Sequence, residues 1–271
     1  MRQDDHRIIE HQRKFFNKNA ELEKPSLTAP LLQEYVNKEQ RLGFEWLLDR
    51  KRILDYGCGT GTSIDAFIKI KQREMPSFIG VDIADLAIQR VKQRYPYFTF
   101  YTIDNNRIPL LQEGSVDGAY LLHVLHHSHD HDAIFREIYS KLQNGGKFFL
   151  SDLSSNNPII RLFRNIFIVS PRVVKKRFSD DLVVDGGIPD KYKVDAKTVI
   201  AKLKDIGFTV QEVGYGHWAL FLFVWLDRFI PFSRFILFRL LFKALESLET
   251  RLLKYRLFYK HAEVFYIKCV K

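Results

Sequence analysis

Apolar residues follow two different spacings along this chain, and the spacing changes several times. Residues 5–19 and 29–49 place apolar side chains three and four positions apart, as in Leu32, Tyr35 and Val36, which predicts helical segments. Further along, short apolar runs that end in glycine or aspartate alternate with stretches of helical spacing. Such runs are typical of strands that are buried on both faces of a parallel sheet.

This alternation predicts a doubly wound α/β sheet. We expect strands, in chain order, at residues 52–57, 77–83, 98–104, 115–125, 147–153, 208–216 and 262–270. Helices are expected within 57–72 and at 84–95, 131–146 and 195–207, the third with a glycine stop and the last with an aspartate cap. Strands and helices in this order define a Rossmann-like, seven-stranded α/β sheet.

Two segments interrupt the alternation. Residues 154–194 follow the fifth strand, and residues 217–260 lie between the sixth and seventh strands. Both leave the carboxyl ends of parallel strands, where ligands bind, so we expect them to form a helical cap over the ligand site. No linker or repeat divides the chain. We therefore expect a single domain over 1–271, with N-terminal helices in 1–49, a cofactor-binding core in 50–153, and a terminal helix and strand hairpin in 195–216 and 261–271.

A glycine-rich turn joins the first predicted strand to the following helix. Gly57 permits the tight turn, Gly59 lets a ligand approach the backbone, and Gly61 lets the helix pack close to the strand. Asp82 ends the second strand about 20 residues later, where a carboxylate can bind the hydroxyls of a ribose. Asp104 ends the third strand at the same edge of the sheet. The pattern predicts a site for a nucleoside-containing ligand.

Four motifs together resemble the class I S-adenosylmethionine-dependent methyltransferases, a broad group that includes the ubiquinone and menaquinone biosynthesis methyltransferases. They are ILDYGCGTG (53–61), GVDI (80–83), the aspartate that ends the third strand, and LLHVLHH (121–127). The resemblance covers 50–153 and the terminal helix and hairpin, but neither insertion. It implies S-adenosylmethionine as cofactor and an antiparallel hairpin at the end of the sheet.

The resemblance also implies which residues bind the cofactor. Those expected at the methionine end and the ribose are Asp55, Gly57, Cys58, Gly59 and Gly61, with Asp82 on the ribose hydroxyls, Ile83 beside the adenine, Asp104 and Asn105 at the adenine amino group, and Leu122 and His123 beneath the sulfonium. A dinucleotide oxidoreductase opens with a similar turn and stays an alternative. Its usual glycine spacing is absent here, and the terminal hairpin favours a methyltransferase.

Five histidines fall in the stretch HVLHHSHDH, residues 123–131. A metal site needs three or four ligands that converge on one point, whereas neighbouring loop residues point in different directions, so we expect no metal. An imidazole at the ligand edge of the sheet can act as a general base near neutral pH. We therefore predict that His126 or His127 removes a proton during catalysis, with a structural role as the alternative for each.

The chain carries a net charge of +10 and a sequence pI of about 9.4, which favours an anionic partner or a solvated basic surface. The proline-rich signature of nucleobase amine methylation is missing after the fourth strand, and neither Cys58 nor Cys269 is placed to attack a pyrimidine, so a nucleic-acid substrate is not expected. Two distant cysteines also exclude a disulfide framework and indicate a reducing cytoplasm.

The insertions combine many phenylalanines and leucines with lysine and arginine, above all in 159–178 and 218–245. No apolar run reaches the roughly 18 residues of a spanning helix, and Pro231 interrupts the second segment. Such helices suit an anionic membrane interface, which predicts a peripheral protein on the inner face of the membrane and a lipid-like or isoprenoid acceptor. Three alternatives stay open: a soluble small-molecule or sugar acceptor, a non-catalytic cofactor-binding membrane-associated protein, and packing of these helices on the core alone. The oligomeric state and the methylated atom stay undetermined.

Overall fold

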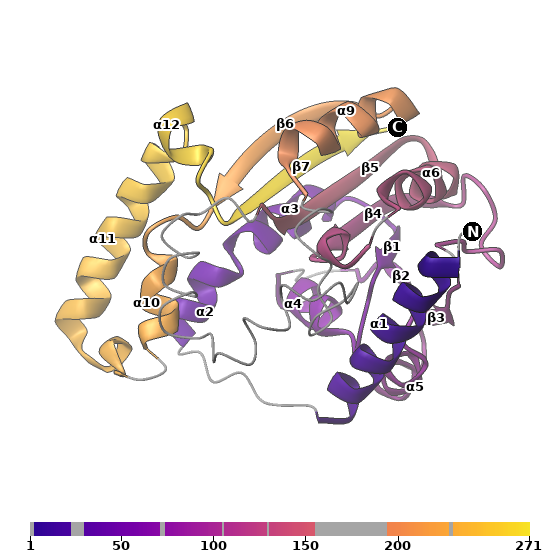
Figure 1. Ribbon diagram of the computed structural model, residues 1–271, viewed down its shortest axis with the longest axis horizontal. Helices are drawn as coiled ribbons and strands as arrows, with labels where there is room; N and C mark the ends of the chain where they lie inside the picture. The colour runs from indigo at the N-terminus through magenta and orange to yellow at the C-terminus, as the bar shows by residue number, and fades with distance from the viewer. Residues whose placement is uncertain are drawn as a thin grey trace.

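The computed structural model describes residues 3–22, 30–70, 74–104, 106–128, 130–154, 194–227 and 230–271. They form a seven-stranded sheet in the order β3-β2-β1-β4-β5-β7-β6 (Figure 1). The strands are β1 Arg52–Tyr56, β2 Ser77–Asp82, β3 Thr99–Thr102, β4 Val116–Leu122, β5 Leu142–Leu153, β6 Thr209–Gly216 and β7 Val264–Val270. Only β7 runs antiparallel to its neighbours, β5 and β6. The predicted Rossmann-like sheet and its terminal hairpin are confirmed.

Helices cover both faces of this sheet. They are α1 Gln3–Leu22, α2 Pro30–Val36, α3 Lys38–Leu47, α4 Thr62–Ile70, α5 Asp85–Arg94, α6 His131–Lys141, α9 Ala196–Ile206, α10 Phe221–Leu226, α11 Ile236–Leu252 and α12 Arg256–Tyr259, with short 3-10 turns η1 Leu125–His127 and η4 Phe232–Arg234. The second insertion therefore contains α10 to α12. The first insertion falls outside the described residues from position 155 to position 193.

The helix expected over 131–146 ends earlier than predicted, at Lys141. Leu142 already has an extended backbone, with φ −71° and ψ 138°, and pairs with Val116 as the first residue of β5. Gly145, at φ +76°, sits where the register of β5 shifts against β4, and its N–H donates to the carbonyl oxygen of Lys271. The glycine pair thus shapes the start of a strand and does not stop the helix.

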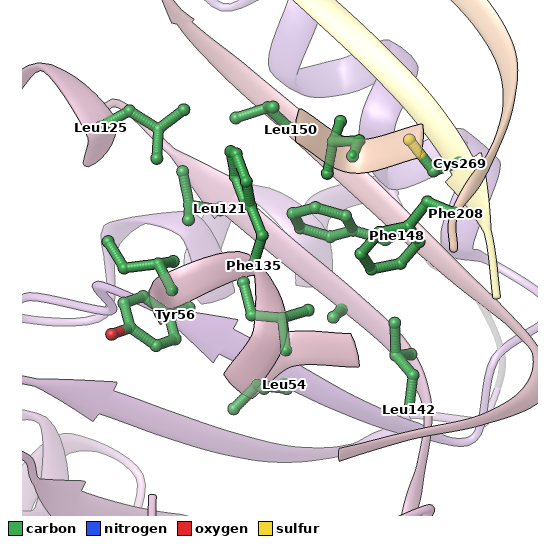
Figure 2. Close-up of a cluster of buried hydrophobic side chains, with 14 of the residues drawn as sticks. Leu54, Tyr56, Leu121, Leu125, Phe135, Leu142, Phe148, Leu150, Phe208 and Cys269 are labelled. Carbon is green, nitrogen blue, oxygen red and sulfur yellow. The ribbon is translucent and has the colours of Figure 1, made fainter. Parts of the chain in front are cut away.

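Two apolar layers hold the helices to the sheet. On one face, α6 and α9 pack against the strands, and Figure 2 shows Phe135 of α6 beside Phe148 of β5 and Phe208. On the other face, α3, α4 and α5 contribute Phe44, Phe67 and other fully buried side chains. Burial of each such side chain contributes on the order of 1.5–3 kcal/mol to the free energy of folding, so these two layers stabilise the packing of the helices on the sheet.

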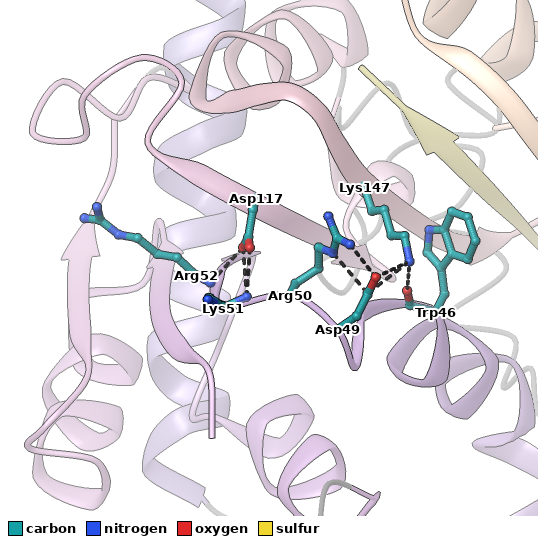
Figure 3. Close-up of polar contacts among 7 residues, drawn as sticks. All are labelled: Trp46, Asp49, Arg50, Lys51, Arg52, Asp117 and Lys147. Carbon is teal, nitrogen blue, oxygen red and sulfur yellow. Dashed lines mark hydrogen bonds and ion pairs between the residues drawn. The ribbon is translucent and has the colours of Figure 1, made fainter. Parts of the chain in front are cut away.

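Polar contacts fix the opposite end of β1 from the glycine turn. The Asp117 carboxylate accepts hydrogen bonds from the backbone N–H groups of Lys51 and Arg52 at 2.9 and 2.7 Å (Figure 3). Nearby, the Lys147 ammonium lies 3.0 Å from both oxygens of Asp49. These polar groups meet one another's hydrogen-bonding needs at the amino-terminal end of β1. Ligands of parallel α/β sheets bind at the opposite edge, beyond the carboxyl ends of the strands.

The second insertion packs on α2, at the side of the molecule away from α1 (Figure 1). A buried carboxylate, Glu249 of α11, accepts a hydrogen bond from the Tyr35 hydroxyl at 2.5 Å and another from the backbone N–H of Leu220 at 2.9 Å. Phe242 of α11 packs edge-on against Tyr35. These contacts tie α11 to α2 and to the start of the insertion.

Candidate cofactor and active site

One pocket opens at the carboxyl ends of β1, β2 and β4. Its wall includes Gly57, Gly59, Asp82, Ile83, Leu122, His123 and His127 of the predicted site residues. Strand pairing explains the convergence, because Tyr56 pairs with both Val81 and Leu121, so the residues that follow these three strands lie side by side. The structure thus brings most of the sequence-predicted groups to one place.

The glycine turn depends on backbone angles that favour glycine. Gly57 and Gly59 have φ of +83° and +50°, in the left-handed region. The N–H groups of Gly57 and Cys58 both donate to the Val81 carbonyl, at 2.7 and 3.0 Å, which anchors the turn to β2. A Cβ at Gly59 would meet nothing within 4 Å, so the backbone there is open to the pocket.

Alanine at these two glycines should separate stability from binding. A Cβ at Gly57 would lie 2.3 Å from Val124 Cγ2, so Gly57→Ala adds a clash to left-handed strain and should cost about 2 kcal/mol or more. Gly59→Ala carries the strain alone, about 1 kcal/mol, but projects a methyl group at the ligand. Urea unfolding and calorimetric titration with S-adenosylmethionine measure both. Equal stability losses in the two variants would contradict the packing described for Gly57.

Asp82 faces the pocket from the end of β2. One carboxylate oxygen accepts from the backbone N–H of Gly59 and the other from that of Ala84, each at 2.9 Å. Burial raises the pKa of this carboxyl group, and these N–H donors oppose the rise. Each oxygen keeps a lone pair beyond its backbone bond, so the carboxylate can accept from ligand hydroxyls while it fixes the glycine turn.

Three predicted cofactor residues stand behind the pocket wall. Asp55 is 2% exposed and accepts from the Ser63 and Tyr120 hydroxyls at 2.7 and 2.8 Å. Burial raises its pKa to about 7. Cys58 is buried with its sulfur against Gly80, and a Cβ at Gly61 would press on Val91 of α5. These residues shape the turn from behind, and direct cofactor contact by them stays a prediction.

The N-terminal helix closes one side of the pocket. Ile9, Gln12 and Phe16 of α1 line it, and the Gln12 side-chain amide donates to the carbonyl oxygen of His127. Arg13 donates to the Ile83 carbonyl and pairs with Asp104, both at 3.0 Å. Asp104 therefore binds α1 and does not line the pocket, so its predicted contact with adenine stays untested. Asn105 lies outside the described residues.

We expect Arg13→Ala to loosen α1 from the pocket without disturbing the chemistry. Its ion pair with Asp104 is partly exposed, which limits the contribution of the pair to about 1 kcal/mol, and the bond to Ile83 adds a similar amount. The KM for S-adenosylmethionine should rise about tenfold with kcat nearly unchanged, as steady-state kinetics measure. Lys14→Ala, on the exposed side of α1, is the matched control. An unchanged KM would show that α1 does not help to hold the cofactor.

The ring of His126 lies between two other histidines, with its centroid 3.8 Å from that of His127 and 6.4 Å from that of His123. His126 Nδ1 lies 2.6 Å from an oxygen of Asp152, a carboxylate at the end of β5 that is 0% exposed. The backbone N–H groups of Leu125 and Leu153 also donate to Asp152, each at 2.7 Å. Burial alone would raise the pKa of this carboxyl group, but His126, His123 and the backbone N–H of Leu153 hold it below its ordinary value. Asp152 thus fixes the ring of His126 and leaves Nε2 for other partners.

His127 and His131 have different further partners. The His127 ring lies 5.0 Å from Phe16 and lines the pocket, while His131 Nε2 approaches the carbonyl oxygens of Leu125 and Ser128 at the start of α6. His129 lies outside the described residues. Within the described ranges, no group of three histidine, cysteine or acidic side chains is arranged to hold a metal ion.

Sequence analysis missed several residues at this site. Gln12 reaches it by docking of a helix some forty residues before the glycine turn, which no local spacing predicts. The position of Asp152 could have been predicted, because this carboxylate lies at the end of the fifth predicted strand, next to the strand that precedes the histidines. Asn106, with a left-handed φ of 61°, lines the pocket. It lies two residues after Asp104, so its place near this edge of the sheet could also have been predicted.

The sheet order, the reversed seventh strand and the glycine turn facing a carboxylate are those of a class I S-adenosylmethionine-dependent methyltransferase. The family model described as "Methyltransferase domain" matches residues 30–213, and the chain belongs to this family. Its cofactor is S-adenosylmethionine, and it is an enzyme. A search of curated protein sequences finds no significant match.

Solved structures share the fold at low sequence identity. A methyltransferase from Archaeoglobus fulgidus is 16% identical, with a TM-score of 0.55 over 88% of this chain and 94% of its own. Phosphoethanolamine N-methyltransferase 2 of Haemonchus contortus, in complex with S-adenosyl-L-methionine, is 17% identical, with a TM-score of 0.55 over 86% of this chain and 52% of its own. The cyclase SpnF is 15% identical, with a TM-score of 0.52 over 86% of this chain and 81% of its own. At these identities the likeness shows the fold and no acceptor.

The described residues fit the cofactor chemically. The open backbone at Gly59 admits a ligand chain, and the Asp82 carboxylate offers acceptors for a ribose. Ile83, Ile103 and Phe16 supply apolar surface of the kind that a purine ring needs. A positive sulfonium placed among these groups meets no described lysine or arginine in the pocket wall.

Proposed function

We propose that this enzyme transfers the methyl group of S-adenosylmethionine to a lipid-like or membrane-held small molecule. The observation that carries the first half is the glycine turn and Asp82 on one pocket wall. The second half is supported by the outer face of α11 and its neighbours. The cofactor supplies an electrophilic methyl group on sulfur, and the residues of this chain supply position and proton transfer.

His126 is the residue that we propose as general base. Its Nδ1 is held by Asp152, so Nε2 can accept the proton of the attacking group. In the step, the acceptor atom forms a bond to the methyl carbon as the carbon–sulfur bond breaks, the sulfur becomes uncharged, and the acceptor proton passes to His126. Most of the rate enhancement comes from alignment and exclusion of water, which the apolar residues at the pocket favour. His127, which lines the pocket through a ring packed on Phe16, is the alternative base.

The outer face of α11 is apolar and exposed. Leu237, Leu240 and Leu241 are 77%, 64% and 58% exposed, although the opposite face of the same helix already packs on α2 and α10. Arg239 and Lys243 lie among these leucines on the exposed surface. An apolar stripe flanked by cations suits the interface of an anionic bilayer. Among the described residues no helix is long and apolar enough to cross a membrane.

Flotation with lipid vesicles tests the membrane part. The protein should rise with vesicles of anionic phosphatidylglycerol, bind less to neutral phosphatidylcholine, and lose binding when Leu237→Glu and Leu241→Glu are combined. Leu110→Glu is the matched control, because Leu110 is 72% exposed on a different part of the chain. Protein that stays at the bottom with anionic vesicles indicates a soluble acceptor instead.

A comparison of extracts tests the acceptor. Lipid extracts of the source cells, with and without the gene, should differ in a species heavier by one methylene group, and the purified enzyme should convert the lighter species in the presence of S-adenosylmethionine. A mass difference confined to the water-soluble extract would favour a small soluble acceptor. Cofactor binding without turnover on either extract would contradict both classes of acceptor.

A further inference from the structure

Left-handed backbone angles outside glycine gather at this edge of the sheet. Among the described residues the positions are Asn106, His123 and His217, with φ of 61°, 56° and 57°. Asn106 and His123 line the cofactor pocket, and His217 directly follows β6. Strain of this kind gathers at ligand sites, where the surrounding structure holds it. His217 therefore marks a part of the edge that the cofactor site leaves unexplained.

His217 meets a buried carboxyl group from α3. Its Nε2 lies 2.9 Å from the Tyr35 carbonyl oxygen and 3.2 Å from Oε2 of Glu39. The other oxygen of Glu39, Oε1, lies 3.9 Å from Nε2 of His123. Because His123 lines the pocket, Glu39 is connected to the pocket through a single imidazole ring.

Polar atoms in this cluster are buried without partners. Glu39 is 3% exposed and His217 4%, yet among the described residues Nδ1 of His217 has no hydrogen-bond partner, and Oε2 of Glu39 has only the 3.2 Å contact with Nε2 of His217, which is not a hydrogen bond. Since the N–H of His217 faces the Tyr35 carbonyl, its Nδ1 carries a lone pair. The Ser151 hydroxyl of β5 is also buried and unpaired, on the sheet face that holds Phe149 and is covered by α3. Folded proteins rarely leave such atoms unpaired, so the pair of Glu39 and His217 indicates a polar ligand group.

The charges around the cluster select the type of group. Lys38, next to Glu39, is engaged with Glu246 and Thr250 at 3.0 and 2.9 Å. The buried lysine of the described chain, Lys141, pairs with Glu137 on α6. The charge of Lys38 reaches both Glu39 and His217, but this ammonium group is already paired, so a phosphate or carboxylate there would be poorly compensated.

Burial favours the uncharged forms of Glu39 and His217. Burial raises the pKa of Glu39 to about 8 and lowers the pKa of His217 to about 4. A protonated carboxyl group donates one hydrogen bond, while Nδ1 of His217 and the Ser151 oxygen accept. A hydroxyl group, which donates one hydrogen bond and accepts others, matches this set.

We propose that Glu39, His123 and His217 hold the polar head of the methyl acceptor, and that this head is an uncharged hydroxyl group. The proposal rests on the proposed function, because it assigns the acceptor half of the same site. The hydroxyl oxygen forms the bond to the methyl carbon as the carbon–sulfur bond breaks, its proton passes to His126, and the product is a methyl ether.

The product chemistry tests the acceptor class. The full chain is incubated with S-adenosylmethionine labelled in its methyl group and a total lipid extract of the source cells. The label should enter a product that survives mild alkali and passes a cation exchanger, as a methyl ether does. Methanol released by alkali would reveal a methyl ester, and retention on the exchanger a methylated amine; either result overturns the hydroxyl head. If calorimetry shows no binding of S-adenosylhomocysteine, the proposed function itself is overturned. If S-adenosylhomocysteine binds but no labelled product forms, the acceptor proposal is overturned.

Substitutions at Glu39 test the cluster. Glu39→Leu removes both hydrogen-bonding atoms and should raise the acceptor KM about tenfold or more, while Glu39→Gln, which can still donate and accept, should stay within about threefold. Calorimetry should show unchanged affinity for S-adenosylhomocysteine in both. Glu212→Leu, at an exposed carboxylate of β6, is the matched control.

Ser151→Ala removes the third unpaired atom with little change in volume and should also raise the acceptor KM, so the proposal stays testable if Glu39→Leu does not fold. An acceptor KM that none of these variants changes would overturn the assignment.

Discussion

Replacing Asp82 with alanine should weaken binding of S-adenosylmethionine about 100-fold or more. The carboxylate offers charge-assisted hydrogen bonds to a ribose, each contributing about 1.5–3 kcal/mol, and about 1.4 kcal/mol corresponds to a factor of ten. The same carboxylate accepts from the N–H groups of Gly59 and Ala84, so its loss also loosens the glycine turn. Calorimetric titration of the purified variant measures the affinity directly.

A neighbouring carboxylate provides the control for this result. Asp85 begins α5, only three residues further on, and is exposed. The affinity of Asp85→Ala for S-adenosylmethionine should lie within about twofold of that of the unmodified protein, because an exposed charge contributes little. Asp82→Asn distinguishes the roles, since an amide keeps one acceptor oxygen for the turn but loses the charge. If Asp82→Ala binds the cofactor normally, the ribose does not lie at this carboxylate.

Loss of either partner in the His126–Asp152 pair should lower kcat about 100-fold or more, the usual contribution of a general base. His126→Ala removes the proton acceptor. Asp152→Asn keeps the volume but has one oxygen for three donors, so the ring of His126 loses its fixed orientation. The KM for S-adenosylmethionine should stay within about twofold in both, since neither residue lines the cofactor pocket. Steady-state kinetics with a fixed acceptor separate the two constants.

Two further variants complete this test. His11→Ala changes an exposed histidine of α1 and should leave kcat unchanged. His127→Ala distinguishes the alternative base, because this ring lines the pocket and packs on Phe16. A large fall in kcat for His127→Ala with none for His126→Ala would move the role to His127. Unchanged kcat in both would show that the reaction needs no histidine base.

The fold followed from local patterns because buried parallel strands and amphipathic helices leave strong signals. The runs at β1, β2 and β4 and the turn after Tyr56 were each predicted within one to three residues. The end of α6 was wrong because two glycines that shape the start of β5 look the same as a helix stop. Tertiary pairing decided between the two, and no local pattern contains it.

The site was predictable only on the strands. The pocket is lined by Gly57, Gly59, Asp82, Leu122 and His123, because their positions follow from the strands that carry them, and their contact with the cofactor stays a prediction. The residues that α1 contributes depend on docking between segments far apart in the chain. The pair of Glu39 with His217 likewise joins α3 to the end of β6, so its chemistry emerges only when both pack on the same edge. Contacts between segments that are far apart in the chain could not be predicted from the sequence alone.

The position of β7 has a consequence for biosynthesis. Because β7 lies between β5 and β6, β6 has no neighbour in the sheet until the ribosome has also made α10, α11 and α12. Until then the backbone of β5 is an open edge that can pair with another nascent chain. A proteolytic nick between β6 and β7 would recreate this edge in the mature protein if the last segment were released. We therefore expect removal of the final strand to make the sheet prone to aggregation.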